Sequence, residues 1–147
     1  MAQQTDPFRG FRFRIEIGGL QVAAFSEASL PDITVETVAY REGTDSTSRR
    51  TLSGLTAFGN VTLSKGLTSS VDLYQWHQIV VQKGSSAANA CRNATITLLD
   101  LEGNVAAQWT LVNALPIRYQ ISGLNASSSD VVIESIEFAV DSMKRVK

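Results

Sequence analysis

Residues 36–66, ETVAYREGTDSTSRRTLSGLTAFGNVTLSKG, are the part of the chain that most clearly indicates its fold class. Both ends of the stretch favour extended structure, because they are rich in β-branched and aromatic side chains. In the polar segment between them, residues 41–58, apolar residues do not recur at the regular spacing of a helix or a strand. It is much longer than a usual hairpin turn of about two to five residues. The pattern therefore predicts a strand, a long interstrand loop and a second strand.

The predicted loop combines charges of both signs with large apolar side chains. Arginine beside apolar residues is a composition typical of protein interfaces. Two interpretations follow: the loop contacts another molecule, or it is solvated and its leucines fold back on their own core. On the first interpretation the candidate contact residues are Arg41, Glu42, Asp45, Arg49, Arg50, Leu55 and Phe58.

The segment before this stretch predicts a strand pair. Apolar and charged residues alternate strictly over residues 11–17, as expected for a strand with one buried face. Gly18-Gly19 then predicts a hairpin to a return strand over residues 20–29. The polar face of the first strand carries Arg12, Arg14 and Glu16, which we interpret as a solvated or subunit-facing surface rather than a phosphate-binding row.

One helix is predicted over residues 69–83. Ser69 and Asp72 have the spacing of a capping box, and Lys83-Gly84 is a typical helix end. One apolar stripe should pack on a sheet, with Trp76 in the core. The stripe consists of Leu73, Trp76, His77 and Val80.

Further strands are predicted at residues 94–100, 105–113, 117–121 and 131–140, and a flexible loop at 123–130. The buried face of the last strand should carry Val132, Glu134, Ile136, Phe138 and Val140. The fold class is therefore mainly β: an antiparallel sandwich or barrel of about eight strands with one packed helix and a long interstrand loop.

Composition limits the function. The length fits one domain over residues 1–147, with a flexible N-terminus at 1–5. A net charge of −1 excludes an overall positive electrostatic potential strong enough to bind nucleic acid. A lone cysteine, Cys91, excludes an intrachain disulfide, and we expect a semi-buried structural thiol.

The single histidine, His77, lacks the partner residues that a catalytic triad or a zinc site would need, so we interpret it as structural and hydrogen-bonded. No catalytic residue, metal site or cofactor is predicted.

No apolar run is long enough for a membrane span, and the N-terminus lacks the apolar core of a signal peptide. We therefore expect synthesis in the cytoplasm.

Several motifs occur in the order found in one known family. They are Asp6-Pro7-Phe8, Phe11 to Ile17, Phe25-Ser26-Glu27, Tyr40-Arg41-Glu42-Gly43, Leu55-Thr56, Phe58 to Leu63, Lys65-Gly66, Leu98-Leu99-Asp100, Gly103-Asn104, Trp109, Asn113-Ala114, Pro116, Tyr119, Leu124-Asn125-Ala126 and Ile133-Glu134. With them the chain resembles the tail tube proteins of contractile phage tails and contractile injection systems. It departs at Ser53, where the family often has proline, and at Leu115, where it often has tryptophan.

The resemblance implies a structural protein without catalytic activity. Its hexameric rings would join their sheets into a continuous β-barrel lumen and stack into a tube inside a sheath. Implied partners are further copies of the chain, the sheath, the baseplate and tube-terminator proteins, and protein effector or phage DNA as cargo in the lumen. No membrane anchor is implied, and the protein would be part of a phage tail or of an extracellular or cytoplasmic contractile particle. Candidate lumen-facing residues are Thr34, Glu36, Asn60, Thr62 and Ser64.

Alternatives from other classes remain at this point. A small-ligand-binding β-barrel predicts a stable monomer with an apolar cavity. A β-sandwich hydrolase would need convergent ionisable groups, which the lone histidine disfavours. A tube ring protein of a type VI secretion system would share the fold.

Overall fold

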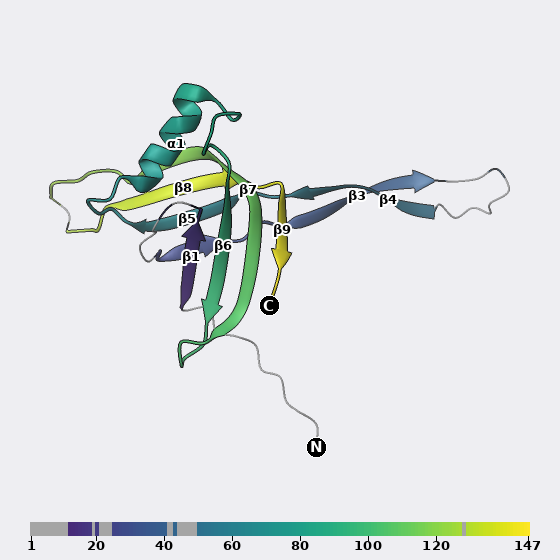
Figure 1. The fold of residues 1–147 in the computed structure, drawn as a ribbon, viewed down its shortest axis with the longest axis horizontal. Helices are drawn as coiled ribbons and strands as arrows, with labels where there is room; N and C mark the ends of the chain where they lie inside the picture. The colour runs from purple at the N-terminus through teal and green to yellow at the C-terminus, as the bar shows by residue number, and fades with distance from the viewer. Residues whose placement is uncertain (1–11, 19, 21–24, 41–42, 44–49, 128) are drawn as a thin grey trace, which may run out of the picture.

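The computed structural model describes residues 12–18, 20, 25–40, 43, 50–127 and 129–147 (Figure 1). The described residues form nine strands and one helix, and every strand pairing is antiparallel, which confirms the predicted fold class. The elements are β1 (Phe13–Ile17), β2 (Glu27–Ser29), β3 (Ile33–Tyr40), β4 (Arg50–Phe58), β5 (Val61–Gly66), α1 (Asp72–Lys83), β6 (Arg92–Leu99), β7 (Val105–Ile121), β8 (Ile133–Ala139) and β9 (Ser142–Arg145).

The long strand β7 belongs to two sheets. Its first half pairs with β6 and β9, and β6 pairs with β1; its second half pairs with β8, followed by β5 and β2. In Figure 1, β7 curves from one strand direction into the other. Asn113 has a positive φ of 53°, and the register with β8 shifts between Pro116 and Arg118, which allows this bend. The two strands predicted over 105–121 are therefore one strand, and Pro116 lies inside it rather than in a loop.

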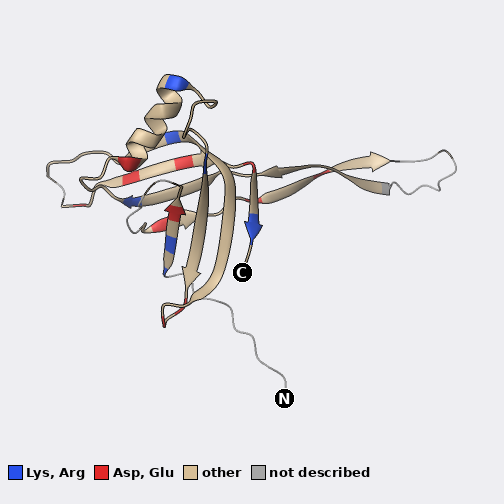
Figure 2. Ribbon diagram, in the orientation of Figure 1, with Lys and Arg blue, Asp and Glu red and all other residues tan. Residues whose placement is uncertain are grey.

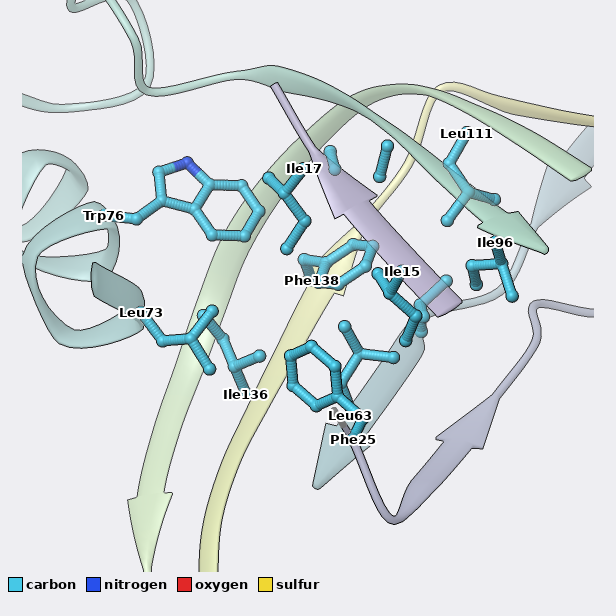
Figure 3. Packing of buried hydrophobic residues seen from close by; sticks show 13 residues of the cluster. Ile15, Ile17, Phe25, Leu63, Leu73, Trp76, Ile96, Leu111, Ile136 and Phe138 are labelled. Carbon is cyan, nitrogen blue, oxygen red and sulfur yellow. The ribbon is translucent and has the colours of Figure 1, made fainter. Parts of the chain in front are cut away.

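The core lies between the two sheets and extends beneath α1 (Figure 3). Much of the core comes from β1 and β8, in which every second side chain points inward. The buried residues of these strands include Ile15, Ile17, Ile136 and Phe138. Trp76 reaches the core from α1 and lies against Phe138, with ring centroids 5.7 Å apart. The predicted buried face of the last strand is confirmed at its central positions.

Helix α1 confirms the predicted helix but begins later, at Asp72. The predicted capping box does not form: the N-cap residue is Val71, which has no side-chain cap hydrogen bond. The helix ends as predicted at Gly84, which has a φ of 83° and whose N–H donates to the carbonyl oxygen of Val80 at 2.9 Å. The Nε1–H of Trp76 donates to the carbonyl oxygen of Ala90 at 2.9 Å, so the one polar atom of this buried ring is satisfied.

The predicted loop over residues 41–58 is wrong in its second half. Residues 50–58 form β4, which pairs with β3 in a two-stranded sheet. Apolar residues do not alternate in this segment, because both faces of the hairpin are exposed and neither face requires an apolar residue at every second position. The connection between the two strands is thereby reduced to residues 41–49.

The predicted hairpin after the first strand forms only its turn among the described residues: the N–H of Leu20 donates to the carbonyl oxygen of Ile17 at 2.8 Å, but residues 27–29 of the predicted return strand do not pair with β1. β1 pairs with β6 along its whole length, and Leu20 makes only an isolated bridge with Ile17. The apolar face of β1 selects this partner, because Phe13, Ile15 and Ile17 lie opposite apolar residues of β6. β2 pairs instead with β5. Residues 21–24 of the predicted return strand lie outside the described part.

Two smaller differences concern the C-terminal half. Strand β9 was not predicted, because its sequence Ser142 to Arg145 is short and mostly polar. Cys91 is exposed rather than semi-buried. Its neighbour Ala90 takes the buried position just before β6, so the Cys91 side chain faces outward, with its Sγ 3.8 Å from the carbonyl oxygen of Ser85.

Candidate assembly surfaces

Strands β3 and β4 form an arm that projects from the rest of the molecule, which we call the body (Figure 1). All residues of β3 and residues 51–57 of β4 are exposed. The arm sequence contains only two charged residues, Glu36 and Arg50, whereas charges are spread over the body (Figure 2). Its large exposed apolar side chains include Ile33, Val35, Val38, Leu52 and Leu55, the last with 78% of its surface exposed. Such a surface is typical of a protein contact.

The arm continues the strand pair β2–β5 at the edge of the body without a change of register. We call the continuous pair, from β2 and β5 out to β3 and β4, the edge hairpin. Ser29 pairs with Thr62 in the body and Ile33 pairs with Phe58 in the arm, so three residues lie between the two pairs on both strands. Between them, the N–H of Gly59 donates to the carbonyl oxygen of Asp32 at 2.8 Å. The faces of the body sheet therefore extend into the arm by simple alternation.

A bulge interrupts the arm near its middle. The register shifts between Val35 and Thr37, so β4 has one extra residue there. Gly54 lies at this point, where an added Cβ would be only 3.2 Å from the carbonyl oxygen of Glu36. The extra residue brings Leu52 opposite Val38 and places Leu52 and Leu55 on the same face, although they are three residues apart.

Few of the predicted contact residues have a described position. Arg41, Glu42, Asp45 and Arg49 lie outside the described residues. Arg50 is the first residue of β4. Leu55 is highly exposed on the arm, and Phe58 is half-buried at its base.

The predicted lumen-facing residues divide between two faces. Asn60, Thr62 and Ser64 alternate along one strand and share a face of the edge hairpin. By register, Thr34 and Glu36 of β3 lie on the opposite face, because Thr34 pairs with Ala57. The structure thus groups three of the five candidates, and none of the five is in the buried core.

The face that carries Thr62 and Ser64 is polar across the sheet β7–β8–β5–β2. The Oγ atoms of Ser64 and Ser135 are 3.0 Å apart across β5 and β8. A shallow hollow of about 70 Å³ on this face is lined by Thr62, Arg118, Gln120, Ser135, Ile136 and Glu137. Two edges of this sheet have no partner among the described strands: β2 on one side, and the second half of β7 on the other.

The opposite, core-facing side of this sheet holds a buried polar group beneath α1. Glu134 is 2% exposed, and its Oε2 accepts a hydrogen bond from the Tyr119 hydroxyl at 2.9 Å. Lys65, 4% exposed, is its cross-strand neighbour. Burial, together with the hydrogen bond and the charge of Glu134, raises the pKa of Tyr119 to about 12. The His77 ring stacks on the Tyr119 ring, with centroids 6.2 Å apart, and the hydrogen bond predicted for His77 stays a prediction.

Arg92 joins the helix to the β1 end of the body. Its Nη1 donates to the carbonyl oxygen of Gly18 at 3.0 Å, and its guanidinium lies 5.9 Å from the centre of the Trp76 ring. Burial lowers the pKa of Arg92, and the Asp72 carboxylate opposes this change. Arg92 is not among the residues predicted from the sequence, because no sequence pattern indicates that it lies beside the helix.

An apolar groove opens between the two sheets of the body. It has a volume of about 320 Å³. Its lining residues are Phe13, Ser26, Glu27, Ala28, Leu30, Ile96, Leu98 and Trp109. The groove brings together residues from distant parts of the sequence, and periodicity within single strands could not reveal it.

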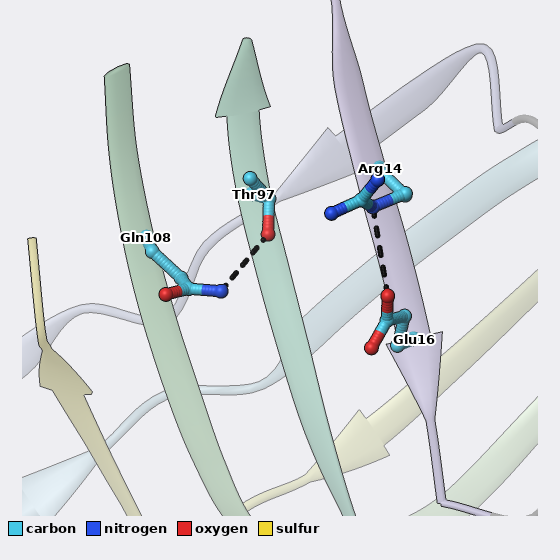
Figure 4. A network of polar contacts seen from close by, with 4 residues as sticks. All are labelled: Arg14, Glu16, Thr97 and Gln108. Atoms are coloured by element: carbon cyan, nitrogen blue, oxygen red, sulfur yellow. Dashed lines mark hydrogen bonds and ion pairs between the residues drawn. The ribbon is translucent and has the colours of Figure 1, made fainter. Parts of the chain in front are cut away.

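The outer face of β1 does not form a row of free cations. Arg14 pairs with Glu16, with 3.5 Å between Nε and Oε1, and both side chains are largely exposed (Figure 4). Beside them, the Nε2 of Gln108 donates to Thr97 Oγ1 at 3.3 Å. The local pairing of Arg14 agrees with a solvated or subunit-facing surface.

The described residues contain neither a metal-binding cluster nor a membrane-spanning helix. In this part of the chain, no cluster of three or more histidine, cysteine, aspartate or glutamate side chains could hold a metal ion. Among the described elements, α1 is too short and too polar to cross a membrane.

The fold of this chain is shared with chains of solved contractile particles. The chain is similar to a chain of the anti-feeding prophage tube-terminating cap, with 26% identity, coverage of 99% and 93% of the two chains and a TM-score of 0.81. It is equally similar to a chain of the anti-feeding prophage baseplate, with 25% identity, 97% coverage of both chains and a TM-score of 0.80. A type six secretion system protein shares the fold at 12% identity, with coverage of 92% and 82% and a TM-score of 0.61.

The fold is thus that of the structural proteins that build contractile tubes. The sequence matches the family of the T4-like virus tail tube protein gp19 over residues 9–144, and the chain belongs to this family. No curated protein matches the sequence. The chain is therefore a structural tube protein of a contractile phage tail or a phage-tail-like injection particle, as its motifs predict.

Proposed function

We propose that this protein forms hexameric rings whose sheets join into one β-barrel, and that these rings stack into a hollow tube inside a sheath. The observation that carries the proposal is the sheet β7–β8–β5–β2, which combines a polar face with two edges unpaired among the described strands. Unpaired edges leave backbone N–H and C=O groups without partners, and pairing with an identical neighbour satisfies them.

The two free edges differ, so the contact between neighbours is head-to-tail. One edge is β2 and the other is residues 115–121 of β7. A contact between two different surfaces of the same chain produces a ring when the rotation closes. The closed ring would have no free edge in this sheet.

The polar face would line the channel. Asn60, Thr62 and Ser64, the three grouped lumen candidates, lie on it, as do Ser135 and Glu137 of β8. Small hydroxyl side chains offer few apolar contacts that would retain a passing molecule. The cargo of this channel would be phage DNA or a protein effector.

The arm would make the contacts between subunits or between rings. Leu55 would supply an apolar anchor, and Phe58 would fix the base of the arm. The charged candidates Arg41, Glu42, Asp45, Arg49 and Arg50 would pair across the interface. Further partners would be the sheath, the baseplate and the terminator, and the protein would make or break no covalent bond.

Electron microscopy of the purified protein tests the proposal, alone and in a lysate of the native producer. We expect rings or stacked tubes with a central channel. A monodisperse monomer with no tubes in the native lysate would contradict the proposal and favour a ligand-binding module.

A pair of variants at one arm position tests the role of the arm. Leu55→Ser should remove rings or tubes, because it replaces an exposed apolar anchor by a hydroxyl. Leu55→Met, which keeps an apolar side chain of similar size, is the matched control and should assemble. Normal assembly of Leu55→Ser would remove this residue from the interface.

A further inference from the structure

The face of the edge hairpin that carries the apolar residues changes twice along its length: once between the body and the inner half of the arm, and once between the two halves of the arm. In the body, the buried residues of β5 are Val61, Leu63 and Lys65, and the alternate residues Thr62 and Ser64 are on the polar face. Because the register continues unchanged into the arm, each face can be followed from the body outward.

In the inner half of the arm, the apolar residues lie on the continuation of the polar face. Ile33 and Val35 alternate on β3, and Ile33 pairs with Phe58. Their exposed fractions are 54% for Ile33 and 47% for Val35. The other face of this half carries Thr34 and Ala57, and so offers little apolar surface.

In the outer half, the apolar residues lie on the other face. Val38 is three residues after Val35, so it projects to the opposite side of β3. The extra residue at Gly54 places Leu52 opposite Val38 and keeps Leu55 on the same side. Across the hairpin, Thr37 and Ser53 form the polar face of this half.

We propose that further copies of the chain cover the arm on opposite faces of its two halves: the Ile33–Val35 face near the body and the Val38–Leu52–Leu55 face toward the tip. This inference rests on the proposed function and specifies how the arm makes its contacts. A partner that lay on a single face would cover the apolar residues of only one half.

A copy of the same chain is the partner whose surface matches. The strands β3 and β4 contain only two charged residues, so an acidic or basic partner would gain little from the two proposed contact faces. The body offers apolar surface that no described residue covers, namely the groove between its sheets with Phe13, Leu98 and Trp109.

Cysteine labelling along the arm tests the inference. The exposed native thiol is first removed by Cys91→Ser. Single cysteines are then introduced at Val35 and Leu52, on the two proposed contact faces. Matched controls are Ala57→Cys and Ser53→Cys, which lie on the opposite face of the same two halves. Each variant is treated with a maleimide as unassembled subunit and as tube.

We expect assembly to slow labelling about tenfold or more at Val35→Cys and Leu52→Cys, and less than about twofold at the two control positions. Ile33→Cys and Leu55→Cys report on the same two contact faces if the first pair prevents assembly. Tubes in which all four positions are protected alike, or in which one face is protected along the whole arm, would overturn the inference and leave the proposed function intact. Absence of tubes in the Cys91→Ser parent would overturn both.

Discussion

The arm continues the edge strands β2 and β5 of the body, but the two regions differ in what surrounds them. In the body, β5 lies between β2 and β8, and its alternate residues Val61 and Leu63 are completely buried. In the arm, β3 and β4 pair only with each other, and both faces are exposed. A hydrogen-bonded strand pair can therefore continue in register beyond the hydrophobic core, where its side chains are no longer buried. Side chains of the body determine folding, and those of the arm are free to determine association.

The largest effect on folding should come from the centre of the body. Phe138→Ala removes a fully buried ring that contacts Trp76, and we expect the free energy of unfolding to fall by about 3–5 kcal/mol. Urea denaturation of the unassembled subunit measures this change. Leu55→Ala on the arm is the control and should stay within about 0.5 kcal/mol of the parent. Equal losses for the two variants would contradict the division between body and arm.

A smaller effect is expected from the polar group beneath α1. Tyr119→Phe removes the hydrogen bond to Glu134 and leaves a buried carboxylate without this donor, which should cost about 1–3 kcal/mol. The parent should also lose stability as the pH rises from about 10 towards 12, because Tyr119 has its ordinary pKa of 10.0 when unfolded and a pKa of about 12 when folded. Above pH 10 the unfolded state releases this proton first.

Urea denaturation over this pH range checks the second part of that prediction. The difference in unfolding free energy between parent and Tyr119→Phe should shrink as the pH rises. A constant difference would show that Tyr119 titrates alike in both states.

The β1 surface should contribute less. Glu16→Gln removes the Arg14–Glu16 pair, whose side chains are 57% and 68% exposed. Because both charges are well solvated, we expect less than about 1 kcal/mol, decreasing further with added salt. Denaturation at low and high ionic strength measures this change. A larger loss would mean that the pair is shielded from water by something other than the chain itself.

The smallest effect on folding should come from the outer arm. Leu52→Ser replaces a half-exposed side chain that has no core contact, so the free energy of unfolding of the subunit should change by less than about 0.5 kcal/mol. Denaturation at a protein concentration too low for assembly isolates this value, because association would add its own stabilisation. A large loss would show that the arm packs on its own body.

The sequence predicted the body better than the arm, and the reason is burial. Residues 11–17 and 131–140 alternate because one face of each strand must be apolar, and β1 and β8 are confirmed. The arm has no buried face, so β4 carried no such pattern and was predicted as a loop. Strand β7 was divided because Asn113 and Pro116 resemble strand ends, whereas here they permit a bend.

The candidate assembly surfaces could be predicted only in part from the sequence. Family motifs indicated the tube protein, and small polar residues indicated a lumen. The faces of Thr34 and Thr62 could not be compared, because their relation depends on the register across Gly59 and on strand pairings that no local pattern reports. The groove with Trp109 also required the three-dimensional arrangement.

Strand β7 gives the subunit a mechanical property. Its 17 residues run without a break through both sheets, so the sheets are joined by covalent backbone as well as by packed side chains. Shear between two separate sheets has only to slide one apolar layer over another. Here the same shear must also break hydrogen bonds along β7 on both sides of its bend. A subunit built in this way resists deformation as one piece when force is applied along a tube.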